Sequence, residues 1–264
     1  MKGKRIVLIS IVAVLGTAVI VFLSLLGVYF FAKKSKPRFI AHRGYSGKYQ
    51  DNTAEAFRAA VEAGFYGIET DIYETADGYL VCNHDREVLF ADGTKKEIRS
   101  STFAELTEKP IKNTKTDSDL YLCTFEDYLR ICAEGKVQAV IEIKELSSKE
   151  KTLEMLAKTD ELYDRTKTSF IDFNLDTLLY LQSVDPTLSL QYLSETKRDE
   201  NFETCLEKGI SISVRQTVLT KSLAKKFHEK NLTVNVWTVN KTFDLQIVRI
   251  KQVDYVTTNV FYKG

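Results

Sequence analysis

Short apolar runs alternate with amphipathic runs along most of this chain, and that alternation restricts what it can fold into. Eight runs are predicted strands because each is short and apolar; they are residues 38–41, 66–72, 137–143, 169–173, 189–193, 210–214, 234–239 and 255–257. Helical runs lie between most of them, at residues 52–63, 148–163, 175–184, 196–207, 219–229 and 243–250. Strands that alternate with helices form parallel βα units, and eight units in about 250 residues predict a (β/α)8 TIM barrel of the α/β class.

One further strand does not fit the parallel pattern. Residues 79–83 follow the second strand too closely for the crossover of about a dozen residues that a parallel pair needs. Asp77-Gly78, just before this strand, is a turn pair typical of tight hairpins. With these two residues as the turn, Asp71 would lie opposite His84 across the hairpin. A polar insertion follows at about residues 86–120, with one short helix expected near residues 103–108. Insertions on this face of a barrel commonly form lids or substrate loops.

Polar residues cluster where three of the predicted strands end. The clusters are three pairs, namely His42 with Arg43, Glu69 with Asp71, and Glu142 with Lys144. Because side chains of a strand repeat their direction every two residues, Glu69 and Asp71 point the same way. Catalytic groups of a barrel lie at the carboxyl ends of its strands, so we expect all three pairs, and His84 from the hairpin, on one rim. Carboxylates that face one place repel one another unless a cation offsets their charge, which favours a metal site.

One apolar segment dominates the start of the chain. Residues 6–32, 27 in all, contain no charged side chain and end in Tyr29-Phe30-Phe31-Ala32 before Lys33-Lys34. At about 1.5 Å per residue, a helix of this length exceeds the roughly 30 Å hydrocarbon core of a membrane. A cleaved signal peptide is the alternative, but its apolar region is usually about 7–15 residues long and precedes a small-residue cleavage site. We therefore expect an uncleaved transmembrane anchor, and the aromatic and basic residues at its end fit that interpretation.

The anchor divides the chain into four parts. We expect a basic tail at residues 1–5, the transmembrane anchor at 6–32, a basic juxtamembrane linker at 33–37 and the barrel at 38–264. Both flanks of the anchor are basic, so the positive charge that usually marks the cytoplasmic side does not fix its orientation. A tail of only five residues suits an anchor that leaves its start in the cytosol. We therefore expect the barrel on the extracytoplasmic side of the cell membrane.

The residues after position 38 form one acidic domain. The first 38 residues carry seven basic and no acidic side chains, which leaves 30 basic against 36 acidic side chains in the rest. A nucleic-acid-binding protein would show the opposite balance or a basic cluster, so nucleic acid is not an expected partner. Cys82, Cys123, Cys132 and Cys205 lack the spacing of a metal site, and we expect buried thiols in place of a disulfide framework.

A set of short motifs resembles the glycerophosphodiester phosphodiesterase family. The motifs are Ala41-His42-Arg43-Gly44, Asp51-Asn52-Thr53, Gly67-Ile68-Glu69-Thr70-Asp71, Thr75-Ala76-Asp77-Gly78, His84-Asp85, Ile141-Glu142-Ile143-Lys144 and Val236-Trp237-Thr238-Val239-Asn240. They occur in the family's order and cover nearly all of residues 39–264. Each motif alone is weak, whereas the ordered set is specific.

The resemblance implies a metal-dependent hydrolysis of glycerophosphodiesters to glycerol 3-phosphate and an alcohol, in which Glu69, Asp71 and Glu142 hold Ca²⁺ or Mg²⁺. A bound cation would offset the three carboxylates and accept an anionic phosphodiester. If the apolar segment holds the barrel near lipid, lysophospholipids or glycerophosphate polymers of a cell envelope are alternative substrates. A catalytically silent barrel that binds a ligand or partner is the other alternative, and the intact histidines and carboxylates argue against it.

The resemblance also gives roles to the remaining site residues. His42 and His84 look like the acid and base pair, since an imidazole with a pKa of about 6.5 exchanges protons near neutral pH. Arg43 and Lys144 look like phosphate-binding residues. Trp237, the only Trp, would line the pocket for the alcohol, although an aromatic side chain in a barrel strand also commonly packs in the core.

Two positions depart from the family's usual pattern. Asp51 stands where the family usually has Glu, and Asn259, after the last strand, stands where the pattern usually ends in Asp. The first keeps a carboxylate, whereas the second removes a charge where the barrel closes. Outside the motifs, His228 lies among lysines on a predicted helix and is expected to be a solvated surface residue. Asn52 and Thr53 are expected to cap the first helix.

Overall fold

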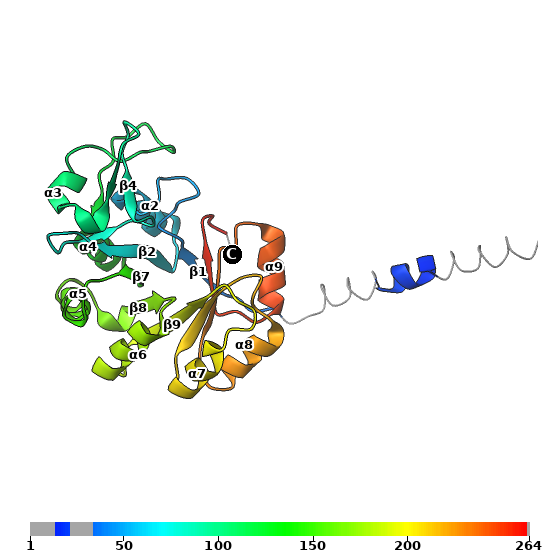
Figure 1. Ribbon diagram of the computed structural model, residues 1–264. Helices are drawn as coiled ribbons and strands as arrows, with labels where there is room; N and C mark the ends of the chain where they lie inside the picture. Colours follow the sequence, from blue (N-terminus) through cyan, green and yellow to red (C-terminus); the bar gives the residue numbers. More distant parts are fainter. Residues whose placement is uncertain (1–13, 22–33, 263–264) are drawn as a thin grey trace, which may run out of the picture.

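The computed structural model describes residues 14–21 and 34–262. Eight parallel strands close into a barrel, because β1 pairs with β12 on one side and with β2 on the other (Figure 1). In chain order the barrel strands are β1 Arg38–Ala41, β2 Gly67–Glu74, β7 Gln138–Glu145, β8 Thr168–Asp172, β9 Ser189–Ser194, β10 Ser211–Arg215, β11 Val234–Trp237 and β12 Tyr255–Thr258. The predicted (β/α)8 barrel is therefore confirmed.

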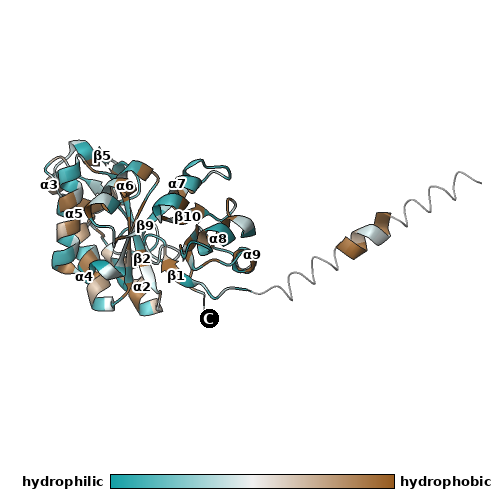
Figure 2. Cartoon of the chain, turned by 90° about the horizontal axis from the view of Figure 1, so that it is seen from below, coloured by the Kyte–Doolittle hydropathy of each residue, from teal (hydrophilic) through white to brown (hydrophobic). Residues whose placement is uncertain are grey.

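Helices cover the outside of the barrel between successive strands (Figure 1). They are α2 Ala54–Ala63, α4 Phe125–Gly135, α5 Lys149–Leu162, α6 Leu175–Val184, α7 Asn201–Lys208, α8 Lys221–His228 and α9 Thr242–Ile250. Figure 2 shows both hydrophilic and hydrophobic residues along these helices, as expected of helices with one buried face. Side chains of Ser, Thr or Asn cap five of them by accepting a first-turn backbone hydrogen bond.

Helix α4 was not identified from the sequence, although its signals are present. Thr124 caps it, and Phe125, Tyr128, Leu129 and Cys132 form one buried face at helical spacing. The Tyr128 hydroxyl donates to the carbonyl of Ile68 at 2.7 Å, so α4 is tied directly to β2. The four cysteines are buried and free, as expected.

The hairpin of β2 with β3 Leu80–Cys82 has a different register from the predicted one. Ile72 pairs with Cys82, and the Asn83 amide donates to the Asp71 carbonyl at 3.0 Å, so Asn83 and not His84 lies opposite Asp71. The expected register is wrong by one residue because the turn has three residues. Gly78, with φ 86°, donates to the Thr75 carbonyl at 3.1 Å and closes the turn in a left-handed conformation that suits glycine.

The insertion after β3 forms a small subdomain with its own core. It contains the hairpin of β4 Glu87–Leu89 with β5 Lys95–Glu97, a 3₁₀ turn Ile98–Ser100, helix α3 Phe103–Leu106 and strand β6 Cys123–Thr124, which pairs with β3. The buried residues of this core are Tyr73 from β2, Val81 from β3, and Val88, Phe90, Ile98, Leu106 and Leu122. The expected short helix is present, whereas the additional hairpin was not predicted.

The expected transmembrane anchor at residues 6–32 lies mostly outside the described residues, as does the basic tail at 1–5. Residues 14–21 are helical. Within residues 14–21 and 34–262, the structure contains no helix with the length and apolar character needed to cross a membrane.

Candidate active site

A cavity of about 220 Å³ opens where the carboxyl ends of the barrel strands meet. Seven of the predicted site residues line it, namely His42, Arg43, Glu69, His84, Glu142, Lys144 and Trp237. The eighth, Asp71, lies within ion-pair distance of two of these residues, Arg43 and Lys144. The rest of the wall was not predicted and includes Phe173, Leu193 and Glu195.

Three buried carboxylates form the acidic part of this site. Glu69 and Asp71 lie on β2, and Glu142 lies opposite Asp71 in the register of the neighbouring strand β7. Their side chains therefore project from adjacent strands, and one oxygen from each lies within 4.8 Å of the other two. The residues are only 2%, 1% and 8% exposed. This concentration of buried acid is the arrangement that the sequence predicted.

Two cations partly compensate the acidic cluster. Lys144 Nζ lies 3.1 Å from Asp71 Oδ1 and also forms an ion pair with Glu142. Arg43 Nε lies 3.3 Å from Asp71 Oδ2. Burial favours the neutral form of Asp71, but Lys144 and Arg43 outweigh it and hold the pKa of this carboxyl below its ordinary value.

The negative charges of Glu69 and Glu142 are not fully offset by Lys144 and Arg43. Burial, together with the charges of Asp71 and Glu142, raises the pKa of Glu69 well above its ordinary value. Burial and Asp71 likewise raise the pKa of Glu142 from 4.5 to about 7. The two cationic side chains therefore do not supply enough positive charge for three ionised carboxylates.

The acidic cluster fits a divalent cation. Asp71 Oδ1 and Glu142 Oε1 are buried, and both form their ion pairs with the same ammonium group, that of Lys144. One ammonium group shared by two buried carboxylates leaves negative charge that is costly to bury, and carboxylate oxygen is the ligand type that Ca²⁺ and Mg²⁺ prefer. Glu69, Asp71 and Glu142 can therefore hold such an ion between them.

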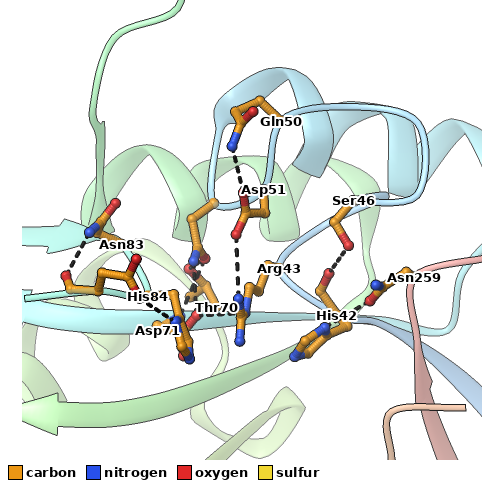
Figure 3. Close-up of polar contacts among 12 residues, drawn as sticks. His42, Arg43, Ser46, Gln50, Asp51, Thr70, Asp71, Asn83, His84 and Asn259 are labelled. Carbon is orange, nitrogen blue, oxygen red and sulfur yellow. Dashed lines mark hydrogen bonds and ion pairs between the residues drawn. The ribbon is translucent and has the colours of Figure 1, made fainter. Parts of the chain in front are cut away.

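A sharp turn after β1 brings Arg43 to the acidic cluster. Arg43 and Gly44 both adopt left-handed backbone conformations, with φ values of 56° and 79°. The Arg43 amide then donates to Glu69 Oε2 at 2.8 Å, and its side chain lies between Asp51 and Asp71 (Figure 3). A Cβ at Gly44 would approach the backbone of Ala56 to 2.7 Å, so this position requires glycine.

Asn52 has a role that the sequence did not reveal. It was expected to help cap the first helix, and Thr53 does so by accepting a hydrogen bond from the Ala56 amide. Asn52 instead adopts φ 55° and donates through Nδ2 to Asp71 Oδ2 at 2.8 Å, while its Oδ1 accepts from the Thr70 hydroxyl at 2.8 Å. Asn is among the few residue types that tolerate this left-handed conformation, which was the available signal. Asn52 therefore orients a carboxylate of the acidic cluster.

The two histidines of the site have different surroundings. His42 is held by a 2.8 Å hydrogen bond between its Nδ1 and Asn259 Oδ1 (Figure 3). Burial, with the charge of Arg43, lowers the pKa of His42 from 6.5 to about 4. His84 is more open, with 39% of its side chain exposed, and its Nδ1 lies 2.8 Å from Asp85 Oδ1.

Two aromatic side chains, Trp237 and Phe173, lie in the cavity wall. Trp237 lines the cavity, as expected, and its Nε1 donates to the Ser213 carbonyl at 3.1 Å. Phe173 meets it edge to face, with ring centroids 5.9 Å apart. His228 lies outside this cavity. It is not the fully solvated residue that was expected, because its Nε2 lies 2.9 Å from Asp254 Oδ2.

Comparisons with known proteins agree on one family. The model of the glycerophosphoryl diester phosphodiesterase family matches residues 42–261. A glycerophosphodiester phosphodiesterase of Bacillus altitudinis is 23% identical over 232 residues, which cover 84% of this chain and 94% of the relative. A solved glycerophosphodiester phosphodiesterase from Parabacteroides distasonis is 26% identical with a TM-score of 0.69, covering 86% of this chain and 94% of that one. An Oleispira antarctica phosphodiesterase, solved with the product sn-glycerol-3-phosphate, is 18% identical with a TM-score of 0.75, covering 88% and 95%.

The raised pKa of Glu142 predicts how the stability of the metal-free protein depends on pH. A carboxyl whose pKa is higher in the folded state than in the unfolded state stabilises the fold below pH 4.5, and this contribution is lost as pH rises through about 7. We expect the free energy of unfolding of the wild type to fall by about 2 kcal/mol more than that of Glu142→Gln between pH 5 and pH 8. Urea denaturation in chelator measures this difference. Equal pH dependence of the free energy of unfolding in both proteins would contradict a raised pKa of Glu142.

Proposed function

The chain belongs to the glycerophosphoryl diester phosphodiesterase family, because the family's model matches residues 42–261, and we propose from this premise how its residues divide the reaction. The protein is a phosphoric diester hydrolase that converts glycerophosphodiesters to glycerol 3-phosphate and an alcohol. The structural neighbour from Oleispira antarctica was solved with the same product, sn-glycerol-3-phosphate. The observation that carries the proposed mechanism is the buried acidic cluster together with two histidines in the wall of the same cavity.

We propose that Glu69, Asp71 and Glu142 hold one divalent cation, Ca²⁺ or Mg²⁺. When bound, the ion supplies positive charge that draws electron density from a phosphoryl oxygen. The raised pKa values of Glu69 and Glu142 support this assignment, as does the close approach of the three carboxylates. Arg43 and Lys144 line the same cavity and would pair with the remaining negative charge of the phosphate.

We propose that His42 takes a proton and His84 gives one. His42 is deprotonated at neutral pH because of its low pKa, so it can accept the proton of an attacking water or of the glycerol 2-hydroxyl. Attack by water gives glycerol 3-phosphate directly, whereas attack by the 2-hydroxyl gives a cyclic phosphate that water must then open. The attacking oxygen forms a bond to phosphorus while the bond from phosphorus to the alcohol oxygen breaks. His84, whose Nδ1 contacts the Asp85 carboxylate, then donates a proton to the departing alkoxide. The proton count balances, since one proton enters His42 and one leaves His84.

We propose that residues 6–32 anchor the enzyme in the cell membrane with the barrel on the extracytoplasmic side. The absence of charge over residues 6–32 and the basic residues that flank them support an anchor. Protease added to intact cells that express the full chain should digest the barrel. Digestion only after lysis would place the barrel in the cytosol.

The proposed anchor favours one alternative substrate class, the lysophospholipids. The same phosphodiester bond links the headgroup of a lysophospholipid, and an anchored barrel would lie close to such lipids. Turnover of soluble glycerophosphocholine should exceed that of lysophosphatidylcholine if glycerophosphodiesters are the preferred substrates. The reverse order would indicate a lysophospholipase D.

The acidic cluster predicts that hydrolysis requires a divalent cation. We expect the full chain to release glycerol 3-phosphate from glycerophosphocholine in the presence of Ca²⁺ or Mg²⁺. Either chelator or the substitution Glu69→Gln should lower the rate at least about 100-fold. Glu203→Gln is the matched control, because Glu203 is exposed on α7 and pairs with Lys226 at 2.7 Å. Activity that ignores chelator would reject the metal role.

The proposed roles of the two histidines predict that the effect of removing His84 depends on the leaving group of the substrate. A nitrophenolate leaves without a proton, so His84→Ala should hydrolyse the p-nitrophenyl ester of glycerol phosphate within about tenfold of wild type, yet lose about 100-fold or more on glycerophosphocholine. His42→Ala should lose activity on both esters. Equal losses of His84→Ala on the two esters would show that His84 is not the proton donor.

A further inference from the structure

Asn259 connects the end of the last barrel strand to a histidine at the other end of the sequence. Its Oδ1 lies 2.8 Å from Nδ1 of His42, which is 217 positions earlier in the chain. The resemblance described above leads one to expect Asp at this position, so the amide is a property of this chain. Figure 3 shows Asn259 on one side of the His42 ring and the second ring nitrogen pointing to the opposite side.

The backbone of Asn259 is fixed from two directions. Its amide donates to Asn240 Oδ1 at 2.8 Å, and its carbonyl accepts from the Gly47 amide at 2.9 Å. A Cβ at Gly47 would lie 2.2 Å from that carbonyl oxygen, so the two segments approach as closely as glycine allows. The backbone that carries the side-chain amide of Asn259 is therefore held in place.

The backbone of His42 is held just as firmly. Its amide donates to the Thr258 carbonyl at 3.0 Å, and its carbonyl accepts from the Ser46 hydroxyl at 2.7 Å. With both backbones fixed, the contact between Nδ1 and Oδ1 sets the rotation of the ring. This is the arrangement expected of a side chain whose orientation matters for chemistry.

We propose that Asn259 is a positioning residue that selects the tautomer of His42. The inference rests on the proposed role of His42 as proton acceptor. An amide oxygen only accepts hydrogen bonds, so Nδ1 must carry the proton of the neutral ring. The lone pair then lies on Nε2, on the side of the ring away from Asn259, and His42 can accept a proton at that atom.

The amide does this without adding charge. A carboxylate would also accept the Nδ1 proton, but it would place a further negative charge beside a cavity that already holds Glu69, Asp71 and Glu142 and that receives an anionic substrate. An uncharged acceptor therefore fixes the tautomer and leaves the electrostatic balance of the cavity to its cations.

Two substitutions separate this role from a purely structural one. Asn259→Leu keeps the size of the side chain and removes the acceptor, whereas Asn259→Asp keeps an acceptor at the same place. Asn201→Leu is the matched control, because Asn201 is a partly buried amide whose Nδ2 donates to the Tyr192 hydroxyl at 2.9 Å. The chain has only three histidines, so ¹⁵N NMR of the full-length protein resolves the tautomer of each ring.

In the wild type we expect the His42 ring protonated on Nδ1. In Asn259→Leu we expect a substantial shift to the Nε2-protonated tautomer and a fall in kcat of about 100-fold with little change in KM. Asn259→Asp should keep the wild-type tautomer and lose less activity than Asn259→Leu, and Asn201→Leu should keep both tautomer and kcat.

An unchanged tautomer in Asn259→Leu would overturn the inference, even if activity fell. A shifted tautomer with kcat equal to that of Asn201→Leu would also overturn it. If the wild type hydrolysed no glycerophosphodiester, the proposed function would fail, while the NMR comparison would still test whether Asn259 selects the tautomer.

Discussion

Three buried carboxylates within 4.8 Å of one another impose a condition on everything around them, because positive charge must be supplied for them to ionise together. Lys144 and Arg43 supply part of it through their ion pairs with Asp71. The raised pKa values of Glu69 and Glu142 indicate that more is needed. A divalent cation meets that need, and it also makes the cavity acceptable to an anionic phosphodiester.

The fold meets this condition through the register of two neighbouring strands. Asp71 and Glu142 are paired positions of β2 and β7, so their side chains meet without any special loop. Irregular backbone then adds the groups that hold them. Arg43 and Asn52 both adopt left-handed conformations, and each contacts Asp71 from a loop between β1 and α2. Regular strands thus place the acids, and strained loop residues orient and compensate them.

The sequence was sufficient for the barrel and for most of the site, because both depend on periodic signals. Strand ends predicted where His42, Glu69 and Glu142 would meet, since parallel strands all present their carboxyl ends to one face. The hairpin register was missed, because a turn closed by Gly78 can contain two or three residues and only the conformation decides. The contacts of Asn52 with Asp71 and of Asn259 with His42 were missed because they join residues far apart in sequence, and no local pattern encodes them.

The most direct test of the central claim is to locate the cation. Crystals of the full chain grown with Mn²⁺, which takes the same oxygen ligands as Mg²⁺, can be measured at a wavelength where manganese scatters anomalously. We expect one strong anomalous peak bounded by the carboxylates of Glu69, Asp71 and Glu142. Density without a peak at that position, with Lys144 still paired to Asp71 and Glu142, would contradict the claim that these three residues hold the ion.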